Sequence, residues 1–259
     1  KGIGARLELA LMTMAMDQAV ANGFVPMMTP TLVTPQVMGG TGFLNEHSEE
    51  IYYLPADDLY LTGTSEVALA GYHADEILDL SAGPKRYMGW STCYRREAGS
   101  AGKDTRGIIR QHQFNKVEMF QYTRPEDSDA AFDELVRKAE DLVKGLGFHF
   151  RTVKLAAGDC SASMARTYDI EIQIPSMNGY KEVSSVSNAR DYQARRGNIR
   201  FRREDGKIEF VHTLNGSGLA TSRIFPAMVE QNQRADGSVV VPEVLRKYLG
   251  GIEVIEKKK

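Results

Sequence analysis

The sequence has few cysteines, no long apolar run and little excess charge of either sign. Cys93 and Cys160 are the only cysteines in 259 residues, which is too few for a disulfide framework and is typical of a reducing compartment. No stretch approaches the ~20 apolar residues of a membrane-spanning helix, and nothing at the start resembles a signal peptide. These absences argue against a secreted disulfide scaffold and an integral membrane protein. They predict a cytoplasmic protein with no membrane partner.

The formal net charge of −2 also limits the partners that the chain could bind by charge alone. Domains that bind a polyanion unaided are usually strongly basic. The one basic run, residues 190–203, alternates its arginines and is interpreted mainly as a solvated strand face. The five histidines have neither metal-ligand nor catalytic-triad spacing, so His112 and His212 are expected to be structural.

The order of helix and strand signals predicts an α+β fold. Strand candidates cluster in hairpins rather than alternating with helices, which favours a mainly antiparallel sheet flanked by helices. Helices are expected over residues 4–22, 65–74, 127–145 and 219–233, and strands over 24–28, 119–122, 148–155, 168–174, 180–184, 199–202 and 208–213. One domain is expected over residues 1–252, with a frayed tail at 253–259. Residues 41–58 are expected to form a loop at the rim of a pocket. The chain begins at Lys1 and runs directly into a helix, which we interpret as a fragment of a longer protein.

The most informative stretch runs from Thr92 to Gln121 and predicts an antiparallel hairpin with a glycine-rich loop at residues 99–105. Arginines can bind a phosphate with both arms, an aromatic ring can stack on a base, and carboxylates can hold an amine. The hairpin carries all three kinds of side chain: Arg95, Arg96, Glu97, Arg110, Phe114 and Glu118. It therefore predicts a nucleotide site that acts on an amino-containing substrate. A charged hairpin with a solvated edge is the alternative.

Three further blocks share this character: Leu61–Tyr72, Asn178–Arg202 and His212–Arg223. In this order, the four blocks resemble class II aminoacyl-tRNA synthetases, in the form seen in seryl-tRNA synthetases of the bacterial type. The resemblance covers essentially the whole chain. It implies activation of L-serine by ATP to seryl-adenylate, with release of pyrophosphate, followed by transfer to serine tRNA.

The same resemblance implies roles for individual residues on the nucleotide side. Arg95, Arg223 and Glu182 are expected to be catalytic. Arg95 would contact the α-phosphate and the serine carboxylate, and Arg223 would hold the γ-phosphate. Glu182 and Ser185 would bind Mg²⁺, a cation that prefers oxygen ligands. The remaining ATP-binding residues would be Arg96, Glu97, Arg110, Phe114, Val183 and Ser184. Without the resemblance, Glu182 would be read as a charge on an edge strand.

On the amino-acid side, the resemblance implies a small polar pocket for serine, formed by Thr64, Ser65, Glu66, Arg95, Glu118, Asn215 and Ser217. A pocket that pairs with the substrate hydroxyl rejects alanine, because its own polar groups would otherwise stay unpaired. Taken alone, residues 64–66 could equally be a helix N-cap, with Thr64 as the cap and Glu66 in the first turn.

The resemblance also leads to expectations about zinc and about dimerisation. A divergent branch of seryl enzymes, and the related carrier-protein ligases, hold zinc through two cysteines and a glutamate. Cys93 lies near Glu118 in the hairpin, but the block at residues 212–223 has no second cysteine, and Cys160 is expected to lie far from the pocket blocks. No zinc is expected. The helix and the proline-containing segment at residues 4–30, with Pro30 as the matching proline, imply a homodimer.

The family's N-terminal coiled-coil arm, which binds the serine tRNA, has no counterpart here, because nothing sustains its heptads. Transfer to tRNA by this chain alone is therefore expected to be weak. A stand-alone ligase acting on a carrier protein is one alternative, although the missing zinc ligands count against it. A non-catalytic paralogue is the other. Arg95, Glu118, Glu182 and Arg223 argue against it, since a scaffold has no need of all four.

Overall fold

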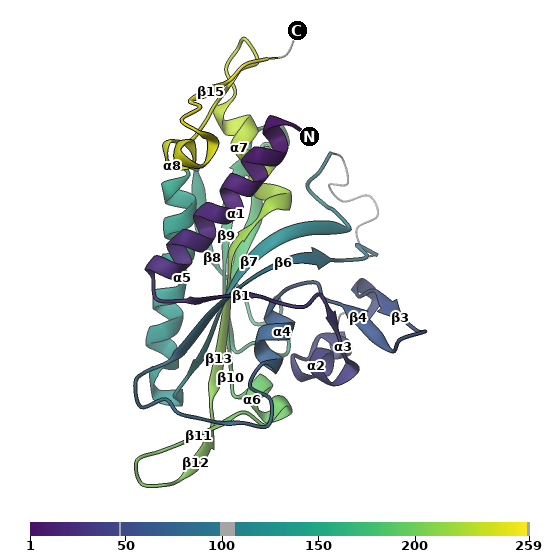
Figure 1. The fold of residues 1–259 in the computed structure, drawn as a ribbon, viewed down its shortest axis with the longest axis vertical. Helices are drawn as coiled ribbons and strands as arrows, with labels where there is room; N and C mark the ends of the chain where they lie inside the picture. The colour runs from purple at the N-terminus through teal and green to yellow at the C-terminus, as the bar shows by residue number, and fades with distance from the viewer. Residues whose placement is uncertain (47, 99–106, 258–259) are drawn as a thin grey trace.

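The computed structural model describes residues 1–46, 48–98 and 107–257. It is built on a seven-stranded sheet in the order β1-β6-β7-β13-β10-β9-β8 (Figure 1). These strands are β1 (Val25–Met28), β6 (Lys85–Tyr94), β7 (Gln113–Thr123), β13 (His212–Ala220), β10 (Gly179–Arg190), β9 (Arg166–Ile174) and β8 (Phe150–Lys154). β1 pairs parallel with β6, and the other neighbours pair antiparallel. The α+β expectation is confirmed. The expected loop at residues 99–105 lies outside the described residues.

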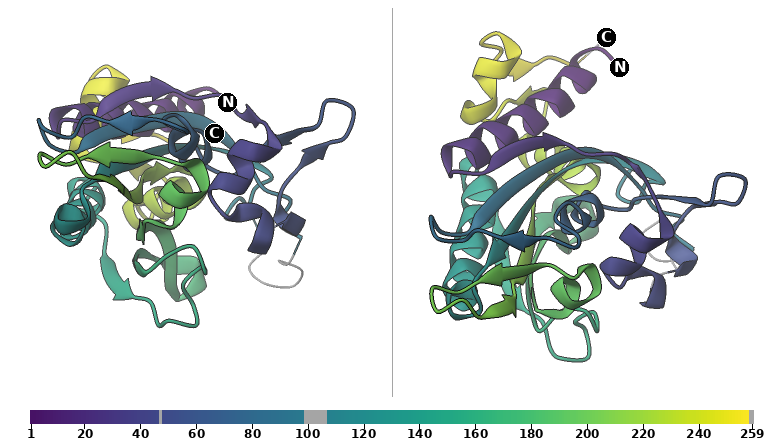
Figure 2. Two further views of the ribbon diagram at one scale, coloured as in Figure 1. Left: turned by 90° about the horizontal axis from the view of Figure 1, so that it is seen from below. Right: turned by 60° about the horizontal axis from the view of Figure 1, so that its bottom comes forward.

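Alternation of side chains along the strands gives the sheet two different faces. On β7, Val117 and Met119 join the larger apolar core, whereas Lys116 and Glu118 point to the other side. The apolar face is covered by three helices, which lie together across it in Figures 1 and 2: α1 (Ile3–Ala21), α5 (Ser128–Gly145) and α7 (Thr221–Asn232). Burial of this face is the main source of stability for such a fold.

The helix expected over residues 219–233 begins later than the sequence indicated. Leu219 stays in β13, and α7 starts at Thr221. Inside α7, Ile224 is buried, while Phe225 and Val229 are partly buried against the same core. α7 therefore packs on the apolar face of the sheet through these side chains.

Smaller elements cover the opposite face. They are β2 (Leu32–Val33), α2 (Pro35–Gly40), α3 (Phe43–Glu46), η1 (Ser48–Glu50), β3 (Tyr53–Leu54), β4 (Leu59–Leu61), α4 (Glu66–Gly71), β5 (Ile77–Leu78), α6 (Tyr192–Gly197), β11 (Arg200–Arg202) and β12 (Ile208–Phe210). A second apolar core containing Phe120, Tyr122 and Phe201 fastens α4, α6 and β11 to the sheet. The polar cavity described below lies on this same face. Two short 3₁₀ turns, η2 (Pro125–Asp127) and η3 (Pro175–Met177), connect strands to neighbouring elements.

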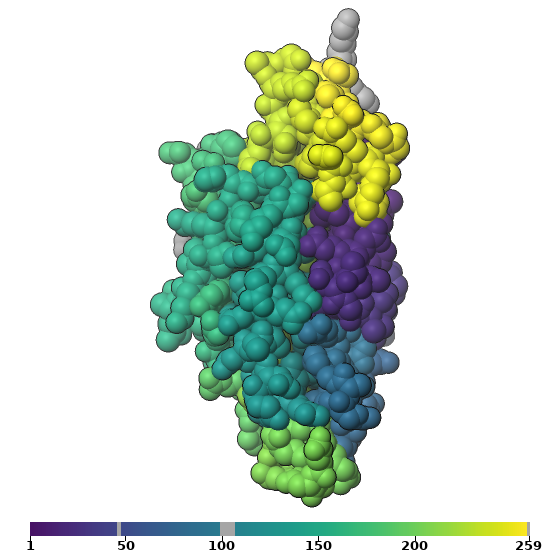
Figure 3. Space-filling model, turned by 90° about the vertical axis from the view of Figure 1, so that its left-hand side faces the viewer, coloured from purple at the N-terminus to yellow at the C-terminus, as the bar shows by residue number. Residues whose placement is uncertain are grey.

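The described chain does not end with α7. It continues through β14 (Val239–Val240), α8 (Glu243–Arg246), η4 (Lys247–Leu249) and β15 (Val254–Ile255). β15 pairs antiparallel with β14, so the segment expected as a tail contains a short strand. Figure 3 shows the C-terminal segment lying beside α1, which α8 and η4 contact.

Among the described residues, no helix has both the length and the apolar character needed to span a bilayer.

Candidate active site

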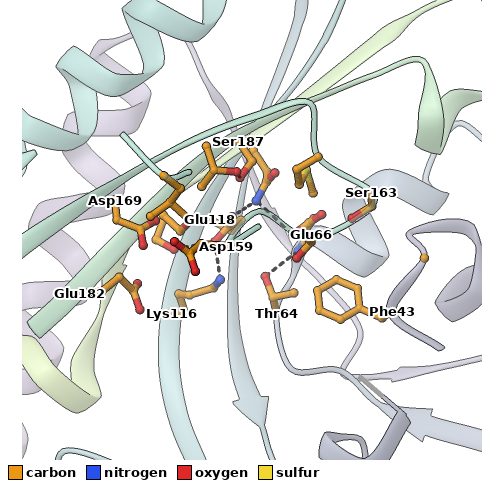
Figure 4. A pocket seen from close by; sticks show the side chains of 18 of the residues that line it. Phe43, Thr64, Glu66, Lys116, Glu118, Asp159, Ser163, Asp169, Glu182 and Ser187 are labelled. Atoms are coloured by element: carbon orange, nitrogen blue, oxygen red, sulfur yellow. Dashed lines mark hydrogen bonds and ion pairs between the residues drawn. The ribbon is translucent and has the colours of Figure 1, made fainter. Parts of the chain in front are cut away.

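A polar cavity of about 310 Å³ opens on the face of the sheet that α5 does not cover (Figure 4). It collects residues from all four sequence blocks, although these are far apart along the chain. The predicted site residues that line it are Thr64, Glu66, Arg95, Glu118, Glu182, Ser185, Asn215 and Ser217. Sequence-distant residues of the expected types therefore meet in one place.

The floor of the cavity is a pair of carboxylates joined by one amide. Glu66 is 4% exposed and Glu118 is 0% exposed. Nδ2 of Asn215 donates to Oε2 of Glu66 at 3.1 Å and to Oε1 of Glu118 at 3.1 Å. Oγ of Ser217 donates to Oε2 of Glu118 at 3.4 Å. Each carboxylate retains acceptor capacity, which suits an ammonium or hydroxyl group of a ligand.

Two floor residues, and Thr213 behind them, come from one strand at alternate positions. Thr213, Asn215 and Ser217 of β13 share a face, because successive side chains of a strand point to opposite sides. Leu214, between two of them, points into the apolar core on the other face. Gly216 lies close to the core as well, since an added Cβ would meet Val186 at 3.2 Å. A regular strand is therefore enough to aim all three polar side chains the same way.

Lys116 belongs to this floor, and the sequence analysis missed it. Its Nζ lies 2.6 Å from Oε2 of Glu118, and the two side chains are 7% and 0% exposed. The signal was present in the sequence, since residues two apart on a strand share a face. With Lys116, the floor carries two carboxylates and one ammonium. A second ammonium, supplied by an amino-acid ligand, would complete the charge balance.

Burial changes the protonation of Glu66. Its pKa is raised to about 7: removal from water and then the nearby charge of Glu118 raise it, while a hydrogen bond from Gln193 and the charges of Lys116 and Arg95 lower it. The amide of Glu66 also donates to Oγ1 of Thr64 at 3.2 Å. Thr64 therefore lines the cavity and accepts a bond from the first residue of α4, whereas the N-cap of that helix is Ser65, whose side chain makes no capping bond.

A smaller hollow of about 50 Å³ adjoins the cavity and shares Arg95, Lys116, Glu182 and Ser217 with it. Phe114 and Arg223 also line this hollow. The guanidinium carbon of Arg95 lies 5.4 Å from the centre of the Phe114 ring. An exposed arginine beside a flat aromatic ring can take a phosphate and a stacked base together.

The arginines here are partnered by acidic side chains. Nη1 of Arg223 lies 2.7 Å from Oε2 of Glu182, and Nη1 of Arg110 lies 2.8 Å from Oε2 of Glu97. Arg110 and Glu97 line a third hollow of about 420 Å³, together with Met38, Phe43, Ile51, Val67 and Tyr94. The pairs keep these side chains in place at the rim.

A β-bulge explains how Glu182 and Ser185 reach the same cavity. They are three positions apart, so in a regular strand they would point to opposite faces. The pairing of β10 with β9 shifts register between Glu182 and Ser184, and such a bulge re-aims the side chains that follow. Across the ladder, Asp169 pairs with Ser185. Asp169 is a further lining residue that the sequence analysis missed.

Asp169, Glu182 and Ser185 form an all-oxygen group. The pKa of Asp169 is raised to about 6, mainly by burial, with a hydrogen bond from Ser185 lowering it and the charge of Glu182 raising it. Its Oδ1 is buried and has no hydrogen-bond partner among the described residues, so it retains capacity for a ligand. No group of three or more His, Cys, Asp or Glu side chains in the described part of the chain could hold a metal by itself. A Mg²⁺ here would need phosphate oxygens and water as well.

Three predicted residues are placed elsewhere. Ser65 is 0% exposed and donates to the carbonyl of Gly89 at 3.2 Å. Ser184 is buried and donates to the carbonyl of Ser217 at 2.7 Å. Arg96 is exposed, and its backbone amide donates to the carbonyl of Glu50 at 2.8 Å. Among the described residues, none of these three lines the hollows above. Val183 does line the smaller hollow.

The segment between β8 and β9 corrects another expectation. Cys160 was expected to lie far from the pocket blocks, yet its neighbours Asp159 and Ser161 line the cavity, as do Ser163 and Met164 (Figure 4). Cys160 and Cys93 are both free. Phe43, which also lines the cavity, comes from the loop expected at the rim of a pocket.

Comparison with known proteins agrees with this geometry. Residues 53–232 match the tRNA synthetase class II core domain (G, H, P, S and T). A serine–tRNA ligase of Leifsonia xyli subsp. xyli is 61% identical over 99% of this chain and 60% of its own length, and one of Thermobifida fusca is 57% identical over 96% of this chain and 59% of its own. The chain thus spans about 60% of the length of these relatives.

A solved structure adds the fold comparison. The crystal structure of seryl-tRNA synthetase from Pyrococcus horikoshii complexed with ATP superposes with a TM-score of 0.96 and 44% identity, covering 100% of this chain and 58% of that one. The domain match covers well over half of the sequence. By its sequence and its fold, the chain belongs to the class II tRNA synthetase core domain family.

Proposed function

We propose that this chain is the catalytic region of a serine–tRNA ligase, which activates L-serine with ATP to seryl-adenylate and pyrophosphate for transfer to serine tRNA. The observation that carries the proposal is the buried floor of Glu66, Asn215 and Glu118 beside a hollow lined by Arg95 and Phe114. One end suits a small amino acid and the other suits a nucleotide. The serine–tRNA ligases described above support the same substrate.

Serine would be oriented by three kinds of contact. Its ammonium group would lie between Glu66 and Glu118, and its hydroxyl would bond to Glu118 and Ser217. Its carboxylate would face Arg95, which borders both the cavity and the smaller hollow. The carboxylate and the α-phosphate are both anions, so bringing them together is the main barrier, which this arrangement removes.

In the reaction, a carboxylate oxygen of serine attacks the α-phosphorus of ATP. A new oxygen–phosphorus bond forms while the bond from that phosphorus to the bridging oxygen breaks, and pyrophosphate leaves with the electron pair. Arg95 offsets charge that builds at the α-phosphate, Arg223 binds the terminal phosphate, and Phe114 stacks on the base. Fixed positive groups at these points supply stabilisation of the transition state without a covalent protein intermediate.

A magnesium ion fits the oxygen group already described. Its ligands would be Glu182, Ser185 and the unpartnered Oδ1 of Asp169. When bound, the ion neutralises charge on the phosphates and holds them in line. We add Asp169 to Glu182 and Ser185, the pair of ligands that the resemblance implies.

A homodimer in the cytoplasm completes the proposal. Leu9 on α1 is 55% exposed, and Val25 and Met28 on β1 are 54% and 80% exposed, as expected for a surface that a second copy would cover. The free state of Cys93 and Cys160 is in keeping with a reducing compartment. Transfer to tRNA is proposed for the whole protein, and adenylate formation for this chain.

The test is amino-acid-dependent exchange between ATP and labelled pyrophosphate. Serine should support exchange, and alanine should be poorer by roughly 10³-fold or more because the floor groups would lose their hydroxyl partner. Threonine and glycine complete the panel. Arg95→Ala should abolish exchange, whereas Arg96→Ala, at an exposed position outside the hollows, should retain it. Exchange with another amino acid would overturn the substrate, and a folded chain that binds ATP without exchange would overturn the activity.

A further inference from the structure

Gln193 lies directly behind Glu66 and reaches it from a different element. It is on α6, is 2% exposed, and its Nε2 donates to Oε1 of Glu66 at 2.8 Å. The Oε1 of Gln193 accepts from Oγ1 of Thr213 at 2.7 Å. Because the threonine hydroxyl occupies the oxygen end, the amide presents its nitrogen to Glu66. The orientation of the amide is therefore set by its own hydrogen bonds.

The two oxygens of Glu66 are held by two different donors. Gln193 binds Oε1, and Asn215 binds Oε2 at 3.1 Å. Each oxygen keeps a further lone pair, which is what a ligand ammonium needs. Asn215 lines the cavity, where a ligand can reach it. Gln193 instead borders a separate hollow of about 150 Å³ with Arg196 and Asp75, so it acts on Glu66 from the rear.

Several groups face Glu66 and influence its charge. β7 supplies Glu118 and Lys116, the end of β6 leads to Arg95, and α6 and β13 contribute the neutral amides of Gln193 and Asn215. Burial and then the charge of Glu118 are the main causes that raise the pKa of Glu66, which is about 7. Among the groups that lower this pKa, Gln193 has a larger effect than Lys116 and Arg95. The hydrogen bond from Gln193 therefore favours the ionised form of a carboxyl whose burial opposes ionisation.

We propose that Gln193 is a positioning residue for the amino group of the substrate: it orients Glu66 and favours its ionised form, which accepts the ammonium group. Gln193 acts through Glu66 and does not contact the amino acid. This inference rests on the proposed function, because it names a determinant of amino-acid affinity at the same site.

Gln193→Leu tests the proposal, since leucine has a similar size and no donor. The pKa of Glu66 should rise, a smaller fraction should be ionised at neutral pH, and the KM for serine at about pH 7 should increase roughly 10-fold, as expected for losing a hydrogen bond to a charged group. The kcat and the KM for ATP should stay within about twofold. The difference in KM should shrink toward about pH 8.5, where Glu66 ionises without help.

Two further variants keep the test decisive. Thr213→Val removes the hydroxyl that orients Gln193 and should raise the KM for serine in the same pH-dependent way, but less. Gln121→Leu is the matched control, because Gln121 is a buried amide with no hydrogen-bond partner, and it should leave the KM unchanged. Thermal unfolding checks that each variant is folded; if Gln193→Leu does not fold, Thr213→Val decides.

An unchanged KM for serine would overturn the inference. So would a rise in KM that is the same at every pH, or a fall in kcat of equal size, since either would mean that Gln193 only supports the packing of α6. Failure of the proposed function is distinguishable, because it would appear in the unmutated chain as exchange that does not depend on serine.

Discussion

The two ends of the cavity are built in different ways. At the floor, Glu66 and Glu118 are buried and hydrogen bonded from β7, β13 and α6. At the end that we propose binds the nucleotide, Arg95 is exposed, and its Nε makes a long hydrogen bond of 3.4 Å to the carbonyl of Gly63. Arg223 there contacts the side chain of Glu182, which is 39% exposed. The floor is organised before any ligand arrives. At the other end, phosphates can replace the acidic partners of the arginines.

This difference predicts which changes affect stability and which affect activity alone. Buried, mutually bonded charges are costly to disrupt one at a time, whereas partly exposed ion pairs contribute little to folding. Substitutions that leave a buried charge of the floor without its partner should therefore lower stability and substrate affinity together. Substitutions at the nucleotide end should lower activity while the protein stays folded.

The largest effect is expected for Glu118→Ala. Lys116 would lose a partner at 2.6 Å while its side chain stays 93% buried, being 7% exposed, so the free energy of unfolding should fall by roughly 3–5 kcal/mol. Serine-dependent exchange should disappear. Urea denaturation measures the first and pyrophosphate exchange the second. Adding Lys116→Met to Glu118→Ala should regain most of the stability; a loss below about 1 kcal/mol in the single variant would show that the floor is not pre-organised.

Arg223→Ala should come next, with its effect confined to catalysis. Loss of a fixed charge at the phosphates should slow exchange by roughly 10²- to 10³-fold. The free energy of unfolding should change by less than about 1 kcal/mol, because its partner Glu182 is well exposed. Arg234→Ala, at an exposed arginine after α7, is the control and should retain exchange. A loss of stability as large as that of Glu118→Ala would remove the contrast between the two ends.

Glu66→Gln should sharpen the comparison through pH. The pKa of Glu66 is raised from 4.5 to about 7, so the folded state holds this proton more tightly than the unfolded state. Its contribution to stability is therefore complete below about pH 4.5 and is lost as the pH rises to about 7. Glutamine does not ionise, so the variant does not lose stability in this way. It should be more stable than the parent at about pH 8, by up to roughly 3 kcal/mol. Exchange with serine should be lost.

Urea denaturation at about pH 5 and about pH 8 measures this effect. The gain should be present at the higher pH and nearly absent at the lower. An equal gain at both values would mean that burial does not raise the pKa of Glu66 as described.

The smallest effect is expected for Arg110→Ala. The Arg110–Glu97 pair lies at the rim, with side chains 33% and 16% exposed, so its removal should change the free energy of unfolding by no more than about 1 kcal/mol. The KM for ATP should rise, and the KM for serine should not. A rise in the KM for serine instead would show that the two ends are coupled through the rim.

The sequence could predict the floor better than its surroundings. Glu118, Asn215 and Ser217 lie on strands, where the alternation of side chains alone decides which face of the sheet each one occupies. The sequence blocks that contain them are uninterrupted. β13 was nevertheless expected to stop at Thr213, because Gly216 and Gly218 weaken a strand signal. The structure needs glycine there: an added Cβ at Gly218 would meet Val117 at 3.0 Å.

The residues that were missed or misplaced depend on contacts between distant segments. Asp169 reaches the cavity through the register of β9 on β10 and its bulge, which no local pattern reveals. Asp159 arrives on a segment without regular structure. Ser65 and Ser184 were assigned because the resemblance covers their blocks, yet their hydroxyl groups bond to backbone carbonyls elsewhere. Proximity in sequence does not tell which way a neighbouring side chain points.

The alternating residues of β13 also limit how this site can evolve. Substitution at Thr213, Asn215 or Ser217 changes one polar group at a time and leaves the others in place. Insertion or deletion of a single residue among them would turn Leu214 toward the cavity and send the amide bridge into the apolar core. Length changes should be tolerated in the exposed turn at residues 203–207, between β11 and β12. New substrate preferences on this scaffold should therefore arise by exchange of side chains, with the length of this strand unchanged.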